Sequence, residues 1–282
     1  MHINISMFCT KLVSKGLISI MQKSFMSQYT TVNFTHGIKT ITMCDQKSRN
    51  SLSIAMMKDL LDNINSDKDN YELRLIIISS TGPVFSAGHN LKEIAVDTQK
   101  QKECFKLASE LMLSIIDSPV PVIAKIDGVA AAAGCQLIAQ CDIAVCTERS
   151  TFSTPGANFG IFCSTPGVAL ARSINKMPTL YMLLTGLPIP AVEAKSVGLV
   201  TQVCSPDNID KDLEVICNAI ISKSRNVIEM GKKFYYKQIQ CDIKEAYDLG
   251  ESEMINNLQN LDCQEGIRSF IEKRKPQWPI KK

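Results

Sequence analysis

A short apolar run, Leu75–Ile78, most constrains how this chain folds, because its β-branched residues predict a strand that is buried on both faces. A turn ends the run, and the chain passes through Phe85–His89 before an amphipathic stretch begins at Leu91. The small residues Ala87 and Gly88 would let backbone amides of this loop approach a ligand closely. An ordinary exit from a strand fits this stretch as well.

A second β-rich run, Val120–Ile126, leads into a stretch with almost no side-chain bulk. That stretch, Gly128–Gln136, reads as a tight turn followed by the first turn of a helix. Free amides at a helix N-terminus attract negative charge. If the two turns face each other, one N–H from each could hold a single carbonyl oxygen, which would make an oxyanion hole.

The two stretches resemble the signatures of the crotonase, or enoyl-CoA hydratase/isomerase, superfamily. Its Phe-x-Ala-Gly-x-Asp-Leu loop is similar to Phe85–Leu91, and its Gly-x-x-x-Gly-Gly-Gly-x-Glu turn-helix is similar to Gly128–Gln136. The resemblance extends from about Tyr29 to Trp278, and is strongest to mitochondrial enoyl-CoA hydratase domain-containing members of the Ser-Ala-Gly-His and Gly-Cys-Gln type. It implies an α/β fold, a spiral of ββα turns with a C-terminal helical part that assembles trimers or paired trimers.

The resemblance also implies that two backbone N–H groups hold the oxygen of an acyl-CoA thioester. In this chain they are the N–H groups of His89 and Ala133, which together with Gln136 are the candidate catalytic residues. The implied substrate-binding positions are Arg49, Ser51, Leu52, Ala87, Gly88, Asn90, Leu91, Gly134, Phe270 and Lys273. No cofactor is implied besides the CoA thioester itself, as substrate or ligand.

Three of these positions have plainer alternatives. In the family, the polar loop that holds Arg49 clasps the CoA adenine and phosphates, and a guanidinium fork suits a phosphate. A solvated loop arginine fits the sequence nearly as well. Phe270 and Lys273 match positions that touch CoA in the family, but a core phenylalanine and a surface lysine are equally compatible with the sequence.

Both glutamates of the family's hydratases are absent. The catalytic glutamate of their Phe-Gly-Gln-Pro-Glu segment is replaced by Gly156, and the second glutamate by Gln136. Neither residue can take a proton from water, and general acid–base catalysis contributes about 10²–10⁴ in rate per group. Ordinary hydration is therefore expected to be weak or absent, and glutamate at both positions would be expected to raise the hydration of crotonyl-CoA.

The side chain of His89 could supply the missing acid or base, because an unperturbed imidazole titrates near pH 6.5. Some family members that decarboxylate malonyl-type CoA thioesters also carry histidine after the Ala-Gly pair. Decarboxylation needs an oxyanion site for the enolate but no base to start it, which suits a site without carboxylates. The alternative is that only the backbone of His89 matters.

The charge is concentrated in the leader. Residues 1–28 contain Lys11, Lys15 and Lys23 and no acidic residue, and the remaining 28 basic residues balance the 28 acidic ones. Apolar residues alternate there with serine, threonine and lysine, which favours a mitochondrial transit peptide, and hence the matrix, over a secretory signal or a disordered tail. A neutral body also argues against nucleic acid as the main partner.

The sequence lacks the signatures of several other classes of protein. No apolar run approaches the roughly 18 to 20 residues that cross a bilayer. The 11 cysteines are scattered without paired spacing, which favours reduced thiols. The three histidines lie far apart, so no metal site is expected. No fingerprint of a nucleotide-binding loop is present.

We therefore expect three parts, a leader over 1–28, a spiral core over 29–205 and a helical region over 206–282. Periodicity alone cannot separate the spiral from a doubly wound sheet. The expected strands are 31–34, 38–43, 75–78, 120–126, 142–146 and 199–204. The expected helices are 51–65, 99–116, 166–174, 178–184, 190–197, 209–220, 225–240, 244–258 and 263–273.

Three functions remain open at this point. The first is an acyl-CoA enzyme of mitochondrial fatty acid metabolism, a lyase of the hydratase-like or decarboxylase kind, or a thioester hydrolase. The second is an acyl-CoA-binding pseudoenzyme with a regulatory role in lipid metabolism. The third is an interaction protein whose oligomer surface matters, with a vestigial pocket. The intact amide loops favour the first two, and the missing glutamates divide them.

Overall fold

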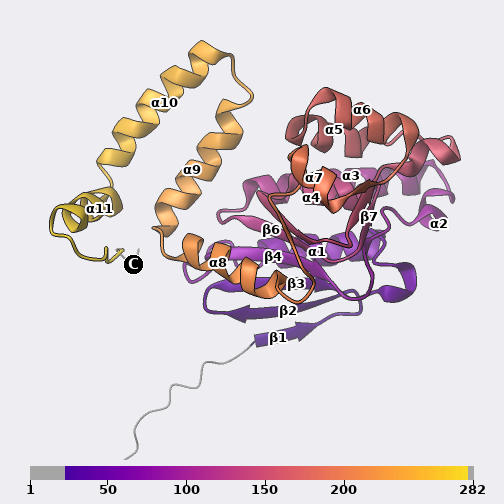
Figure 1. The fold of residues 1–282 in the computed structure, drawn as a ribbon, viewed down its shortest axis with the longest axis horizontal. Helices are drawn as coiled ribbons and strands as arrows, with labels where there is room; N and C mark the ends of the chain where they lie inside the picture. The colour runs from indigo at the N-terminus through magenta and orange to yellow at the C-terminus, as the bar shows by residue number, and fades with distance from the viewer. Residues whose placement is uncertain (1–22, 279–282) are drawn as a thin grey trace, which may run out of the picture.

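The strand that Leu75–Ile78 predicts lies in the middle of a seven-stranded sheet (Figure 1). The computed structural model describes residues 23–278. The strand order is β1-β2-β3-β4-β6-β8-β11, antiparallel from β1 to β3 and parallel from β3 to β11. The strands are β1 (Lys23–Met26), β2 (Thr30–Thr35), β3 (Ile38–Met43), β4 (Leu75–Ser80), β6 (Val122–Ile126), β8 (Ile143–Thr147) and β11 (Gln202–Cys204).

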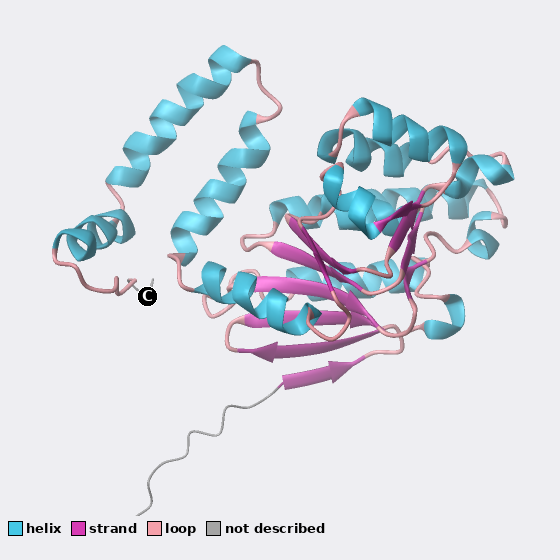
Figure 2. Ribbon diagram, in the orientation of Figure 1, coloured by secondary structure: helices cyan, strands magenta, loops and turns pink. Residues whose placement is uncertain are grey.

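A second sheet of four very short strands stands beside the first, in the order β10-β9-β7-β5 (Figure 2). These strands are β5 (Val84–Ser86), β7 (Val129–Ala131), β9 (Thr151–Ser153) and β10 (Ile189–Pro190). After β4, β6 and β8, the chain adds one strand of the second sheet and then a helix. This repeat is the spiral of ββα turns, so the fold prediction is confirmed and the doubly wound alternative is excluded.

Helices α1 and α3 cover the core because each has one apolar face. The buried positions Met56, Leu60 and Ile64 of α1 recur at helical spacing, as do Cys104, Leu111 and Ile115 of α3. The helices of the spiral are α1 (Ile54–Asn65), α2 (Leu91–Ile94), α3 (Thr98–Asp117), α4 (Ala133–Gln140), α5 (Ser164–Ser173), α6 (Lys176–Thr185) and α7 (Ala191–Ser196). Two 3₁₀ turns, η1 (Gln46–Ser48) and η2 (Pro155–Phe159), shape the loops near the candidate site.

The C-terminal helices form an arm that projects away from both sheets (Figure 1). Helix α8 (Ile209–Ile221) still packs on the large sheet through Leu213 and Cys217. The arm consists of α9 (Arg225–Gln238), α10 (Ile243–Leu258) and α11 (Leu261–Ile271). Helix α10 buries no residue, and Phe270 of α11 is 84% exposed. The arm therefore presents apolar side chains that no residue within 23–278 covers.

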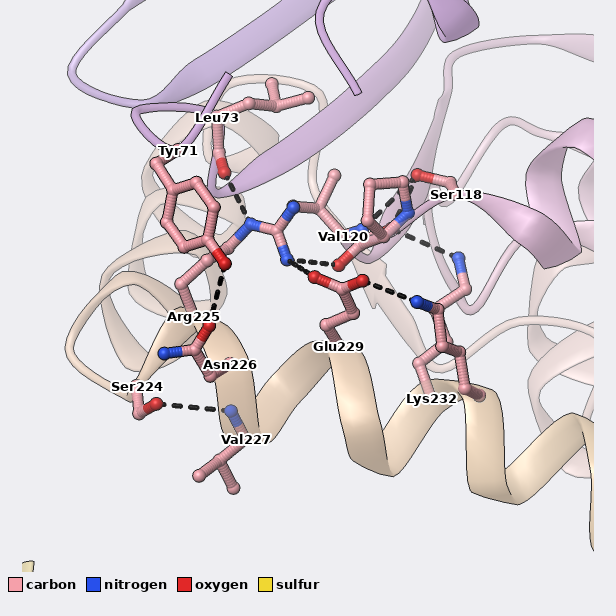
Figure 3. Close-up of polar contacts among 12 residues, drawn as sticks. Tyr71, Leu73, Ser118, Val120, Ser224, Arg225, Asn226, Val227, Glu229 and Lys232 are labelled. Carbon is pink, nitrogen blue, oxygen red and sulfur yellow. Dashed lines mark hydrogen bonds and ion pairs between the residues drawn. The ribbon is translucent and has the colours of Figure 1, made fainter. Parts of the chain in front are cut away.

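Two buried cations join the arm to the core (Figure 3). Arg225 donates from Nε to the Leu73 carbonyl at 3.0 Å and from Nη1 to the Pro119 carbonyl at 2.7 Å. About two turns further along α9, Lys232 Nζ donates to the Val120 carbonyl and to Asp142 Oδ2. Because both side chains donate to backbone carbonyls of the core, the base of α9 is held in one position.

Most expected elements agree with the structure within a few residues. The four strands of the second sheet were not expected, because strands of two or three residues carry no periodicity. Strand β1 begins at Lys23, inside the range that we assigned to the leader, and the rest of the leader lies outside the described residues. No helix within 23–278 has the length and apolar character that a bilayer span needs.

Candidate functional site

The two glycine-bearing loops lie against each other, as the oxyanion-hole hypothesis requires. Gly88 has φ of +86°, and a Cβ placed on it would lie 2.9 Å from the Ala131 oxygen and 3.2 Å from the Ala133 nitrogen. Gly134 approaches the other loop just as closely, since its added Cβ would lie 2.7 Å from the Ser86 oxygen. Only residues without a side chain permit this contact between β5 and the start of α4.

A parallel bridge between Leu52 and His89 orients the first loop. Leu52 N–H donates to the Gly88 carbonyl at 2.8 Å, and in a parallel bridge the neighbours of His89, rather than His89 itself, bond to Leu52. The backbone N–H of His89 therefore points away from the Leu52 strand. Within residues 23–278, it donates to no backbone carbonyl.

The second loop ends at the N-terminus of α4. Ala132 precedes the helix with φ of +48°, and its N–H donates to the Ser153 carbonyl at 2.9 Å. Ala133 is the first helical residue, so its N–H has no partner within the helix. In the described part of the chain, no other backbone carbonyl accepts from it. Its amide is therefore available at the positive end of a helix dipole.

The loop at 45–52 is tied to the first signature. The carbonyl of Arg49 accepts from Ala87 N–H at 3.1 Å, and the exposed guanidinium is free to reach a ligand. Asn50, which the sequence analysis did not single out, is fully buried and donates from Nδ2 to the carbonyls of Thr81 and Val84 at 3.0 and 2.8 Å. Its backbone is left-handed, with φ of +50°, in a region where asparagine is enriched among non-glycine residues.

Three further residues that the sequence predicts to contact the ligand are Ser51, Asn90 and Leu91. Ser51 is buried beside Leu52, and its hydroxyl has no partner among the described residues. Asn90 caps α2 by accepting from Lys92 N–H at 3.1 Å, and Leu91, which starts α2, is 53% exposed. Ser51, Asn90 and Leu91 thus lie next to the contact between Leu52 and His89.

Within one chain, Phe270 and Lys273 lie away from this site. They lie on α11 and just after it, at the opposite end of the molecule from α2 (Figure 1). Within one chain, the structure therefore does not bring them to the loops of Arg49 and His89.

The ring of His89 is fixed on the protein side of the loop. Its Nδ1 lies 3.4 Å from the Leu52 carbonyl and 3.7 Å from Cys104 Sγ, and the ring meets Phe105 edge-on at 5.4 Å. Because a carbonyl can only accept, Nδ1 carries the hydrogen in this contact. The buried Nε2 is then an acceptor, and it has no partner among the described residues.

Burial lowers the pKa of His89, while the Leu52 carbonyl and the nearby Glu93 oppose this shift in part. Burial also raises the pKa of the neighbouring Cys104 thiol to about 11, so it is protonated at neutral pH. The pair is thus a neutral imidazole beside a neutral thiol. It is not the ion pair of a cysteine nucleophile.

Positions 136 and 156 correspond to the two glutamates of the family's hydratases, and at position 156 there is no space for a side chain. A Cβ on Gly156 would lie 2.3 Å from the Ile161 oxygen and 2.6 Å from Cys163 Sγ. Gln136 is 5% exposed, and its Oε1 has no partner in the described part of the chain. A glutamate fits position 136 by shape, but at position 156 it would require η2 and the following loop to move.

Comparison with known proteins agrees with this geometry. The model of the Enoyl-CoA hydratase/isomerase family matches residues 33–281. The chain belongs to the enoyl-CoA hydratase/isomerase family. Its relatives include the human protein named enoyl-CoA hydratase domain-containing protein 3, mitochondrial, which is 48% identical over 86% of this chain and 80% of the relative. The protein of the same name from Danio rerio is 42% identical over 96% of both chains.

A solved structure supports the membership in this enoyl-CoA hydratase/isomerase family. The crystal structure of the human enoyl-CoA hydratase domain-containing protein 3 matches with a TM-score of 0.87 and 46% identity, over 89% of this chain and all of the other. The resemblance to the mitochondrial branch of the family, noted from Ser-Ala-Gly-His and Gly-Cys-Gln, is therefore confirmed.

The neutral state of the family signature's His89 makes stability depend on pH. Its folded pKa is lowered, so the unfolded chain binds more protons and stability falls as the pH drops below about 6.5 towards the folded value. We expect His89→Asn to flatten the decrease in melting temperature between about pH 7.5 and about pH 5.5. His36→Asn, in an exposed turn, is the matched control and should leave the decrease unchanged. Equal slopes for wild type and His89→Asn would contradict the assignment.

Proposed function

We propose that this protein binds an acyl-CoA thioester in the mitochondrial matrix and acts in fatty acid metabolism. The thioester oxygen would accept from the N–H groups of His89 and Ala133. The observation that carries the proposal is the close packing of Gly88 on Ala131–Ala133, which brings the two turns that carry these amides into contact. The mitochondrial names of its relatives support the location.

The CoA part would lie along the loop of Arg49, Ser51 and Leu52. The exposed Arg49 guanidinium is suited to a phosphate, and Ala87–Gly88 leave the backbone open to the pantetheine arm. Phe270 and Lys273 would complete this contact from a second copy of the chain, in a homotrimer or a hexamer. The exposed apolar face of the arm supports such an assembly.

The reaction would not be ordinary hydration. Positions 136 and 156 carry an amide and no side chain, so neither can act as a general base. A neutral His89 beside the amide pair is compatible with decarboxylation of a malonyl-type thioester, because the oxyanion pair alone would stabilise the enolate. A lyase of this kind is the enzyme we favour.

The second candidate is an acyl-CoA-binding pseudoenzyme that regulates lipid metabolism. The observation in its favour is the closed wall at Gly156, where the Ile161 oxygen and Cys163 Sγ fill the space of a catalytic side chain. This wall would leave the binding of a thioester intact.

A panel of acyl-, enoyl- and malonyl-CoA thioesters separates these possibilities. The full-length protein is incubated with each, products are followed by mass spectrometry, and binding is measured by calorimetry. We expect micromolar binding of several thioesters and, for an enzyme, loss of CO₂ from malonyl-type substrates. Binding without products would favour the pseudoenzyme. If no CoA thioester binds, the proposal fails and a pure interaction protein remains.

A further inference from the structure

We propose that a cavity between α9, α10 and α11 binds a small aliphatic ammonium ion, and that the carboxylate of Asp262 receives its charge. This cavity lies in the C-terminal arm, away from the loops of His89 and Ala133 (Figure 1). Binding at this place is therefore separate from the proposed thioester site, and neither depends on the other.

The cavity lies where α10 and α11 return beside α9. Its volume is about 830 Å³, which falls within the range of small-molecule sites. Its apolar walls are Met230 and Phe234 of α9, Leu249 of α10 and Leu261 of α11. These side chains suit the methylene groups of a short aliphatic ligand.

Asp262 gives the cavity a buried acceptor that lacks a donor. The residue is 4% exposed and lies in the first turn of α11. Its Oδ2 accepts from Asn226 Nδ2 at 2.6 Å, and Asn226 Oδ1 accepts from Tyr71 OH at 3.0 Å (Figure 3). Its Oδ1 has no hydrogen-bond partner within residues 23–278. A buried carboxylate oxygen without a donor is unusual and points to a ligand that supplies one.

The charges around the cavity favour a cationic donor. The charged side chains that line it are Glu229, Lys233, Lys237, Glu253 and Asp262. Glu229 and Lys233 pair with each other, and Lys237 is exposed to solvent. The carboxylates of Glu253 and Asp262 remain to receive a ligand. An ammonium group binds a carboxylate more strongly than a neutral donor does, because the hydrogen bond is charge-assisted.

An alkyl diamine has the chemistry that these walls require. One ammonium group would donate to Asp262 Oδ1, the methylenes would contact Phe234 and Leu249, and the second ammonium would face Glu253. A divalent metal ion fits less well, since no group of three acidic, cysteine or histidine side chains within residues 23–278 could hold one. The whole chain carries a formal charge of +3, so net charge alone does not attract a small cation.

The test measures binding of putrescine, a four-carbon diamine, to the full-length protein by calorimetry at about 150 mM salt. Butanediol is the neutral probe of similar length. Asp262→Asn can keep the bond from Asn226 while it turns an amide donor towards the cavity. Glu251→Gln is the matched control, because Glu251 is exposed on α10 and does not line the cavity.

We expect wild type and Glu251→Gln to bind putrescine equally well. Asp262→Asn should lower the affinity by at least about tenfold, because a charge-assisted hydrogen bond is lost. Butanediol should bind at least about tenfold more weakly than putrescine for the same reason.

A second pair of variants tests the site without touching Asp262, and decides the matter if Asp262→Asn does not fold. Leu249→Trp fills the cavity and should also lower the affinity for putrescine by at least about tenfold. Leu258→Trp adds the same bulk to α10 outside the cavity and should leave the affinity unchanged. Circular dichroism and light scattering establish that the variants share the fold and the oligomeric state of wild type.

The proposal is overturned if putrescine does not bind at millimolar concentration, or if butanediol binds equally well. Binding that folded Asp262→Asn and Leu249→Trp leave unchanged would also overturn it. If wild type binds no diamine and Asp262→Asn changes the oligomeric state, a basic side chain from a second copy occupies the cavity, and the proposed ligand is wrong.

Discussion

Replacing Gly88 with alanine is expected to lower the affinity for acyl-CoA by about tenfold or more. The residue has φ of +86°, and the new Cβ would lie 2.9 Å from the Ala131 oxygen and from Ala132 Cβ. Real Cβ atoms do not approach a backbone that closely, so the two loops must separate. Loss of two hydrogen bonds to the thioester oxygen costs about 1–3 kcal/mol, which is about 5- to 150-fold in affinity. Calorimetry with octanoyl-CoA, after circular dichroism has shown a folded protein, measures the loss.

Gly160→Ala controls for the backbone strain alone. Gly160 has φ of +72°, but no atom lies within 4 Å of the Cβ that would be added. Its substitution carries the same kind of conformational cost without moving the loops. We expect its affinity to stay within about twofold of wild type. If Gly88→Ala also binds that tightly, the convergence of the His89 and Ala133 amides is not what holds the thioester.

Replacing Lys232 with methionine is expected to destabilise the protein by about 3 kcal/mol or more. Lys232 Nζ donates to the carbonyls of Ile115 and Val120 at 2.7 and 3.1 Å, and to Asp142 Oδ2 at 2.7 Å. Removing the cation leaves the buried Asp142 carboxylate without its counter-charge and takes one donor from each of two buried carbonyls, and breaking a buried pair in this way typically costs about 3–5 kcal/mol. Urea unfolding with linear extrapolation gives the change.

Lys233→Met is the matched control on the next position of α9. Lys233 is exposed and pairs only with Glu229 at the surface, so its loss should stay within about 0.5 kcal/mol. The double variant Lys232→Met with Asp142→Asn should recover part of the stability, because it removes both charges. Similar costs for the two lysines would mean that the buried cluster does not hold the arm.

The long elements of this fold could be predicted from the sequence because each has a period or a composition of its own. Helix α1 repeats buried residues at Met56, Leu60 and Ile64, and the first four residues of β4, Leu75–Ile78, are all apolar. The strands of the second sheet could not be predicted in the same way. β7 consists of Val129–Ala131 only, and it is a strand because it lies between β5 and β9, far away in the sequence.

The candidate site was partly predictable for a similar reason. Small residues such as Gly88 and Gly134 mark where backbone must come close, even before the partner is known. Asn50 was missed because a polar loop residue gives no sign of the carbonyls that it will bind. Gly156 shows the opposite case. The missing glutamate is visible in the sequence, but the Ile161 oxygen that fills its place is not.

The sequence by itself determined the order of the longer strands and helices, the two loops with little side-chain bulk, and the absence of carboxylates at positions 136 and 156. The tertiary structure alone decided that the loops meet, that Phe270 lies far from them within one chain, and that Gln136 lines a cavity bordered by α3, α5 and α9. The physical reason is the sequence separation over which each effect acts. Backbone preference and burial pattern act between neighbours in the chain, whereas contact between loops depends on how the sheets and the arm pack.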